Sequence, residues 1–235
     1  MMTAKERFDS NDFLRILCVG DIQTAQPYFK PSWIDWMART LQEAGDLQIA
    51  WRRQVTSSAV SRATPKHVAT YYRHYVEQYR PDIVLVSFGV TPMYPTYIEK
   101  QFAAELDSLL LRLEKQSVTT VLWSPYPLLA GLQREVSLSL NSLYKQKAIE
   151  RGIQFIDLYH EFDEVELSKI FTFKVGVKND LFGLSVGDID PITLNEIGQY
   201  IIAKKIVYDL FRIALPQSDY GSFVTPALDS VKKWA

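Results

Sequence analysis

The sequence contains one cysteine, three histidines and no long run of uncharged apolar residues. Cys18 cannot form an internal disulfide, so a reducing, cytoplasmic setting is expected. No segment approaches the roughly 18 apolar residues of a transmembrane helix, and the polar, charged start of the chain is unlike a signal peptide. The small number of histidines also limits which residues can act as a general base near neutral pH.

The chain has almost no net charge, with a formal value of -1 at pH 7. No overall field attracts nucleic acid or an anionic membrane, so neither is expected as a partner. Hydrophobic residues make up 47% of the 235 residues, which is enough for one full core. We expect a flexible N-terminal arm over residues 1–12, one domain over 13–213 and a C-terminal tail over 214–235. No cofactor and no metal ion are expected.

Short apolar runs alternate with amphipathic segments along the domain. Continuous apolar runs that end in turn residues are typical of strands buried on both faces of a parallel sheet. The alternation predicts a three-layer α/β/α sandwich around a five-stranded parallel sheet. The strands are expected at residues 14–19, 47–51, 83–88, 118–123 and 153–156, and the helices at 31–44, 65–79, 96–115, 133–151 and 193–213.

Two segments show no regular pattern. Residues 52–64 are rich in Ser, Thr and Arg and are expected to form a loop, and residues 157–189 form a long irregular segment that is functional or covers the core. The helix that begins at Pro65 carries a stripe of tyrosines, which is interpreted as core or interface packing. Ligands of parallel sheets bind beyond the carboxyl ends of the strands, so the residues that follow each strand are the candidates for a site.

The last expected helix opens with an informative stretch, D-P-I-T-L-N-E-I-G, over residues 190–198. Thr193, followed by Glu196 three residues later, is the pattern of a capping box, and Thr193 is the expected helix cap. The stretch resembles the D-x-x-H-L-N-x-x-G signature of SGNH/GDSL hydrolases. Asp190, Leu194, Asn195 and Gly198 fit that signature, whereas Thr193 stands in the place of its histidine. A second register, which fits fewer residues, would put Asp190 itself in the histidine place.

The other family blocks fall after the first three expected strands. The G-D-S block, whose serine is the nucleophile, corresponds to Gly20, Asp21 and Ile22. The glycine that helps to bind the oxyanion corresponds to residues 55–58, and the G-x-N-D block corresponds to residues 89–92, with Thr91 in the asparagine place. The resemblance covers residues 14–213, and it implies the strand order 2-1-3-4-5.

The same alignment implies that the family's chemistry is lost. Ile22 has no heteroatom to attack a carbonyl, and the hydroxyl of Thr193 does not take up a proton near neutral pH. Asp190 is retained, and the hydroxyl of Thr91 could replace one oxyanion donor. No catalytic residue is therefore expected at the degenerate positions 22, 91 and 193.

The resemblance implies a pocket at the strand ends, with nine residues at its rim. Carboxylates there could activate a water or hold a cation, but a role in capping backbone N–H groups is the preferred interpretation. His160 is the histidine nearest to the rim and could act as a displaced base, and Ser87 and Ser124 are further hydroxyls close to strand ends. The expected rim consists of Asp21, Ile22, Ser57, Ser58, Gly89, Thr91, Asp188, Asp190 and Thr193.

Three functions remain open. The first is a non-catalytic SGNH/GDSL-like protein that binds a small molecule, an acyl or sugar ligand at the rim, or a protein partner or second copy. The second is a diverged but active ester hydrolase or acyltransferase, of the esterase or deacetylase type, that uses rim carboxylates or His160. The third is a structural interaction protein that makes its contacts through the tyrosine-rich helix and the C-terminal tail.

Overall fold

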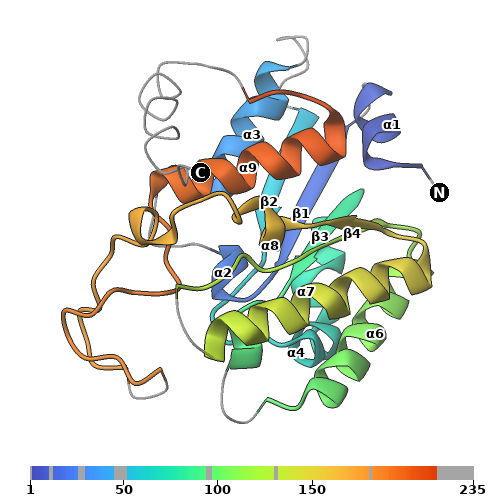
Figure 1. Cartoon of the computed structure of the whole chain (residues 1–235). Helices are drawn as coiled ribbons and strands as arrows, with labels where there is room; N and C mark the ends of the chain where they lie inside the picture. The colour runs from blue at the N-terminus through green and yellow to red at the C-terminus, as the bar shows by residue number, and fades with distance from the viewer. Residues whose placement is uncertain are drawn as a thin grey trace.

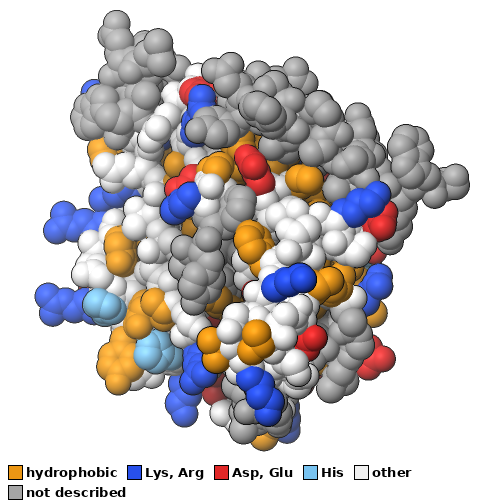
Figure 2. All heavy atoms as spheres, turned by 90° about the vertical axis from the view of Figure 1, so that its left-hand side faces the viewer, with side chains coloured by type: hydrophobic (Ala, Val, Ile, Leu, Met, Phe, Trp, Pro, Cys, Tyr) orange, Lys and Arg blue, Asp and Glu red, His pale blue; other side chains and the backbone are white. Residues whose placement is uncertain are grey.

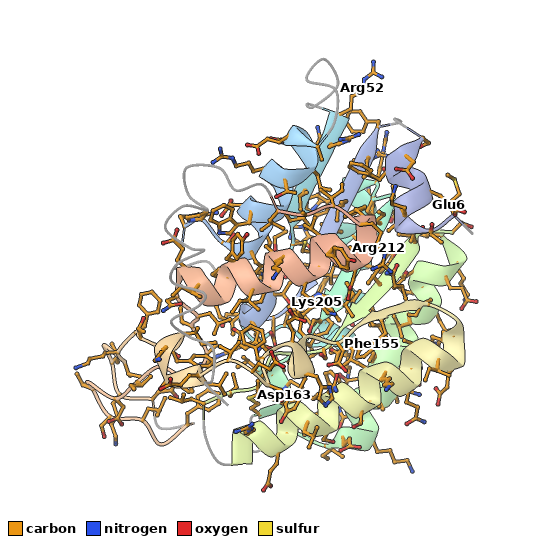
Figure 3. The ribbon with its side chains drawn as sticks, turned by 45° about the horizontal axis from the view of Figure 1, so that its top comes forward. Glu6, Arg52, Phe155, Asp163, Lys205 and Arg212 are labelled. Carbon is orange, nitrogen blue, oxygen red and sulfur yellow. The ribbon has the colours of Figure 1, made fainter. Side chains whose placement is uncertain are left out.

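Five parallel strands form one sheet between two layers of helices in the computed structural model (Figure 1), which describes residues 2–10, 13–25, 30–44, 52–93, 97–129, 132–179 and 182–215. The order across the sheet is β2-β1-β3-β4-β5, which confirms the predicted fold and strand order. Figure 3 labels Arg52, just before β2, and Phe155 of β5, at the two edges of the sheet. The strands are β1 (Leu14–Gly20), β2 (Arg53–Ser57), β3 (Ile83–Ser87), β4 (Thr119–Trp123) and β5 (Gln154–Ile156).

The helices divide the core into two parts, one on each face of the sheet. On one face lie α1 (Ala4–Asp9), α3 (Trp33–Glu43) and α9 (Glu196–Phe211), and on the other lie α4 (Pro65–Thr70), α6 (Glu99–Lys115) and α7 (Leu132–Arg151) (Figure 1). The shorter elements are α2 (Ile22–Ala25), α5 (Tyr72–Tyr75), α8 (Leu158–Glu161) and the 3₁₀ turns η2 (Glu77–Tyr79), η3 (Thr91–Met93) and η4 (Leu167–Lys169).

The central strands are apolar because helices cover both of their faces. Every residue of β3 and β4 is buried, as expected for a parallel sheet packed on both sides. The pairing of Gly20 with Ser87, and of Val86 with Leu122, brings the carboxyl ends of the three central strands to one edge. This register gathers the segments that follow β1, β3 and β4.

The second strand was predicted at the wrong place. The predicted strand at 47–51 lies outside the described residues, and β2 instead occupies residues that were expected to form a loop. At the edge of the sheet β2 is only partly covered, so it reads R-Q-V-T-S without an apolar run. Its buried Arg53 donates from Nη1 to the carbonyl of Leu41 at 2.8 Å and lies over the ring of Phe8.

The expected N-terminal arm is a packed helix, so that prediction is wrong for the described residues 2–10. Thr3 and Glu6 form a capping box at the start of α1. Ala4 and Phe8 are buried, and the ring centroids of Phe8 and Phe211 lie 5.4 Å apart. The pattern was too short to identify as a helix, because only one face of about two turns meets the core. Met1 and residues 11–12 lie outside the described residues, as do residues 216–235 of the predicted tail.

Two of the predicted helices also differ from the structure. The tyrosine-rich helix is broken into α4, α5 and η2, because Tyr71 leaves the helical region with φ -102° and ψ 37°. The last helix begins at Glu196, and its cap is Asn195, whose side chain accepts from the N–H groups of Ile197 and Gly198. The predicted capping box at Thr193 is therefore wrong. None of the helices in the described ranges is long and apolar enough to cross a membrane.

Candidate functional site

The ends of β1 and β3 are tied together by the carboxylate of Asp21. This side chain is fully buried, and it accepts hydrogen bonds from the backbone N–H groups of Gln23 at 3.1 Å, Val90 at 2.7 Å and Thr91 at 2.8 Å. The strands can approach because position 20 is glycine, where a Cβ would lie 1.9 Å from the carbonyl oxygen of Ser87. The first and third family blocks therefore form one hydrogen-bonded unit.

Two opposing effects act on the acidity of Asp21. Burial raises its pKa above 3.8, because a charged carboxylate loses its hydration, while the N–H groups of Thr91, Val90 and Gln23 favour the charged form and limit the rise. Both carboxylate oxygens face backbone donors. This geometry agrees with the capping interpretation of Asp21.

Ile22 stands directly after this carboxylate, as the first residue of α2. Its partly exposed side chain is a branched hydrocarbon, without an atom that can attack, donate or accept. The rest of α2 holds the site together: Thr24 donates from its hydroxyl to the carbonyl of Ser87 at 2.8 Å, and Gln23 donates to the carbonyl of Tyr126 at 3.4 Å. Ile22, which the sequence resemblance places at the nucleophile position, is thus held between hydrogen-bonded neighbours and carries no nucleophilic atom.

Thr91 does not offer the oxyanion donor that the sequence suggested. Its hydroxyl donates to the carbonyl of Ala63 at 2.8 Å, and its N–H donates to Asp21. A hydroxyl has a single proton to donate. Thr91 therefore fixes the loop after β2 to the end of β3 rather than presenting a donor to a ligand.

The turn before α9 contains the retained aspartate. One oxygen of Asp190 accepts from the N–H of Ile192 at 2.8 Å, and the other accepts from the hydroxyl of Thr193 at 2.7 Å. Tyr126 donates from its hydroxyl to the carbonyl of Ile192 at 2.6 Å. Because Tyr126 is also bonded to Gln23, this turn is linked to the nucleophile place through one residue.

The serines of the second block have structural contacts. Ser58 is buried, and its N–H donates to the carbonyl of Cys18 at 3.0 Å. Ser57 is exposed, and its hydroxyl accepts from the N–H of Ala59 at 3.2 Å. Gly89 packs so tightly that a Cβ would lie 1.6 Å from Oε1 of Gln23. These contacts brace the loops around α2.

Asp188 is exposed, whereas Asp21 is buried. Its carboxylate accepts from the N–H of Ser185 at 2.6 Å, within an antiparallel turn in which Lys174 pairs with Ile189. No group of three or more His, Cys, Asp or Glu side chains among the described residues is placed to hold a metal ion. The alternative in which Asp21, Asp188 and Asp190 share a cation is therefore wrong.

His160 pairs with a carboxylate away from these blocks. Its Nδ1 lies 2.8 Å from Oδ2 of Asp157 and 3.4 Å from the amide nitrogen of Asn141 on α7. The pair lies at α8, directly after the edge strand β5, and the imidazole is exposed. Ser124 caps α8 by accepting from the N–H groups of Leu158 and Tyr159. The hydrogen bonds of the His160 ring to described residues involve Asn141 and Asp157 and no hydroxyl that it could activate.

Two tyrosines that organise the site were given no role by the sequence. Tyr126 follows β4 in S-P-Y-P, and its position after a strand marked it only as a residue to examine. Tyr144, in α7, accepts at its hydroxyl from the N–H of Phe88 at 2.8 Å, and burial raises its pKa well above the ordinary range. A tyrosine inside an apolar helix face is a weak signal, since the partner of its hydroxyl depends on the tertiary fold.

The sheet order and the blocks at its carboxyl edge define the class of protein: an SGNH-type α/β/α hydrolase fold. A family model of the GDSL-like lipase/acylhydrolase family matches residues 18–171. The chain belongs to this family. A comparison with curated proteins finds no match.

Solved structures with the same fold are esterases and acylhydrolases of low sequence identity. The acetyl xylan esterase AlAXEase is 17% identical with a TM-score of 0.66, over 84% of this chain and 100% of its own. An acetylxylan esterase from Geobacillus stearothermophilus is 16% identical with a TM-score of 0.66, over 85% and 94%. A lipase/acylhydrolase from Enterococcus faecalis is 15% identical with a TM-score of 0.65, over 87% and 100%. At these identities the likeness shows the fold alone.

The Geobacillus esterase has also been solved in several altered forms. Those described as catalytic mutants replace by alanine a serine, an aspartate, or a histidine three positions after that aspartate. Asp190 and Thr193 have the same spacing in the present chain.

Proposed function

We propose that this protein is a non-catalytic member of the GDSL-like family, which uses the edge of its sheet to bind a small acyl or sugar ligand. The observation that carries the proposal is the 2.7 Å hydrogen bond from the hydroxyl of Thr193 to Asp190. In a Ser-His-Asp arrangement the aspartate orients an imidazole. Here it holds a hydroxyl that cannot accept the proton of a nucleophile.

The nucleophile place supports the same conclusion. Ile22 has no heteroatom, so no covalent acyl intermediate can form on it. The nearby hydrogen-bond donors are already bonded within the protein. The carboxylate of Asp21 accepts from the N–H groups of Val90 and Thr91, and the carbonyl of Ala63 accepts from the hydroxyl of Thr91. Two parts of a triad that act as a unit are thus replaced together.

One specific observation favours the second candidate, an active but diverged ester hydrolase or acyltransferase. His160 and Asp157 form an aspartate–histidine pair at 2.8 Å, and the other ring nitrogen of His160 carries no hydrogen bond to a described residue. A base of this kind still needs a nucleophile or a bound water in its reach. Catalysis through His160 would therefore be insensitive to changes at positions 22 and 193.

The test is turnover of a panel of aryl acetate, acetyl-sugar and thioester substrates by highly purified protein. We expect no rate above the buffer background. Ile22→Ser alone and Thr193→His alone should also remain inactive, whereas the double variant, with Thr91→Asn to add a donor, is the form in which weak turnover should appear. Activity in the unmodified protein that His160→Ala abolishes would establish the enzyme instead.

We also propose a cytoplasmic location. Cys18 is buried and unpaired, and burial raises the pKa of its thiol, so the reactive thiolate is suppressed.

A protein partner or a second copy of the chain remains an alternative occupant of the rim, and size-exclusion chromatography with light scattering distinguishes these two from a small ligand.

A further inference from the structure

A hollow of about 200 Å³ lies between the last turns of α6 and α7, at the amino ends of β4 and β5. Its walls come from the two helix ends and from residues at the start of the two strands. The two helix ends meet on the right of Figure 1. Figure 2 faces the carboxyl edge of the sheet, the left of Figure 1, so the hollow lies on the far side of the molecule in that view. It is therefore separate from the rim.

The walls of the hollow are mainly apolar. Leu110 and Val118 are buried, and Ile153 is partly buried and packs against the same core. Beside them, a Cβ at Gly152 would meet no atom within 4 Å, so the hollow is open on that side. A dry cavity of about 150 Å³ with apolar walls is large enough for a benzene. The hollow therefore has room for one six-membered ring and a small substituent.

A guanidinium and a carboxylate form the polar part of the lining. Arg151 donates from Nε and Nη2 to Oδ1 of Asp107, at 3.3 Å and 2.9 Å. Its Nη1 lies 3.6 Å from Oε2 of Glu114, beyond hydrogen-bond distance, and forms no hydrogen bond with a described residue. The side chain of Arg151 is only 19% exposed. A donor and an acceptor thus face each other across a gap that a direct hydrogen bond does not close.

A single hydroxyl group can close this gap. A hydroxyl both accepts and donates, and an oxygen at the usual distance of about 2.8 Å from each of two atoms can bridge a separation of this width. Hydrogen bonds to charged partners are also the stronger ones. The polar part of the lining therefore suits a ligand with one hydroxyl, and the apolar walls suit its ring.

We propose that the hollow binds a small neutral phenol. The ring would lie against Leu110, Val118 and Ile153. Its oxygen would accept from Nη1 of Arg151, and its O–H would donate to Glu114. Because the hollow lies at the opposite edge of the sheet from the rim, the inference goes beyond the proposed function and holds whether or not the rim binds an acyl or sugar ligand.

The charges of the lining favour a neutral ligand over an ionised one. A carboxylate bound to Arg151 would lie beside Glu114, and an ammonium bound to Glu114 would lie beside Arg151. Like charges placed side by side are strongly unfavourable. A plain hydrocarbon ring would fill the apolar part but leave the donor and the acceptor unbridged. Of these four kinds of ligand, the phenol alone matches both parts of the lining.

The experiment is an NMR titration at pH 7 of the full chain, labelled at its Leu, Val and Ile methyl groups, with phenol, toluene, benzoate and benzylamine. We expect phenol to shift the methyl signals of Leu110, Val118 and Ile153. Phenol should bind about tenfold more tightly than toluene, as a net hydrogen bond to a charged group predicts. Benzoate and benzylamine should bind more weakly than phenol.

Glu114→Gln separates the charge of the acceptor from its shape. A neutral acceptor forms a weaker hydrogen bond, so this variant should bind phenol roughly threefold more weakly than the natural protein. Benzoate should bind it more tightly, because the repulsion is removed. The opposite direction of either change would contradict the proposed position of the hydroxyl.

Ile153→Trp should fill the hollow and abolish the binding of phenol. Ile149→Trp is the matched control, because Ile149 is a 74% exposed residue of α7 that does not line the hollow. Methyl signals far from the substitution show whether each variant is folded, and Glu114→Gln decides if Ile153→Trp is not.

No binding of phenol, equally tight binding of toluene, tighter binding of either ion, shifts confined to the carboxyl edge, or equal losses in the two tryptophan variants would each overturn the proposal. The esterase panel tests the rim alone, so failure of the proposed function would leave these results unchanged.

Discussion

Asp21 is the residue on which the carboxyl edge of the sheet depends. Its two oxygens accept three backbone N–H groups from two segments that are about 70 residues apart. Backbone donors that are buried without an acceptor are costly. A single side chain therefore determines how the segment after β3 lies against α2.

Asp21→Asn should destabilise the fold although it conserves shape. The side-chain amide nitrogen would replace one carboxylate oxygen and would then face the N–H group of Gln23 or that of Val90. At least one buried N–H group would lose its acceptor and lie against another donor. We expect a loss of about 3 kcal/mol in the free energy of unfolding. Urea denaturation followed by circular dichroism measures it. A loss below about 1 kcal/mol would mean that the carboxylate is not needed as an acceptor.

The difference in unfolding free energy between the natural protein and Asp21→Asn should depend on pH, and this dependence reports the pKa of Asp21. Burial raises the pKa above 3.8, so between 3.8 and the higher value the folded state binds more protons than the unfolded state. The stability of the natural protein relative to Asp21→Asn should therefore be largest below pH 3.8 and should fall as the pH rises through the folded pKa. Urea midpoints for both proteins across this range test the sign. A difference that grows with pH would show that the N–H groups outweigh burial.

At the scale of single elements, the start of α9 shows how a cap can be misplaced by sequence. T-L-N-E offers two candidate caps two residues apart. Thr193 fits the capping-box pattern, but its hydroxyl is bonded to Asp190, and Asn195 accepts from Ile197 and Gly198 instead. The local sequence pattern does not decide which residue is the cap. Thr193 can cap the helix only if its hydroxyl is not already hydrogen-bonded to Asp190, three residues earlier.

Asn195→Ala should cost about 1 kcal/mol of stability, because two N–H groups of the first turn of α9 lose their acceptor. Glu196→Ala is the control, since it would remove the side-chain acceptor that a capping box with Thr193 requires. That variant should stay within about 0.5 kcal/mol of the natural protein. Thermal unfolding of both variants provides the comparison. The opposite order of effects would restore Thr193 as the cap.

The central strands were predictable because burial on both faces leaves a continuous apolar run, and the edge strand β5 and the long helices because their apolar residues are closely spaced or recur at helical spacing. β1, β3, β4 and β5 lie within a residue or so of the predicted runs. The edge strand β2 was not predictable in this way, since partial exposure permits Arg, Gln, Thr and Ser. The same distinction applies to the site: the positions after the strands were recognisable, whereas the contacts of Tyr126 and Tyr144 depend on segments brought together only by the fold.

At the scale of the whole molecule, charge is divided although the total is near zero. Positions 60–80 contain four Lys and Arg against one acidic residue, whereas positions 157–166 contain five acidic residues and no Lys or Arg. The two segments follow different strands on the molecule, after β2 and after β5. A net charge is therefore a poor guide to partners of this protein, because local fields extend over distances close to the Debye length of about 8 Å at physiological salt.

The hydroxyl of Tyr126 has a further consequence for the time course of folding. It joins residues 66 positions apart, and Gln23 reaches the same tyrosine across 103 positions. Contacts between such distant segments close long loops and tend to form late. Tyr126→Phe should then accelerate unfolding while leaving the refolding rate nearly unchanged, in stopped-flow urea jumps. The rim would be the last part of the molecule to assemble and the first to open. A ligand bound at the rim would therefore lower the unfolding rate more than it raises the folding rate.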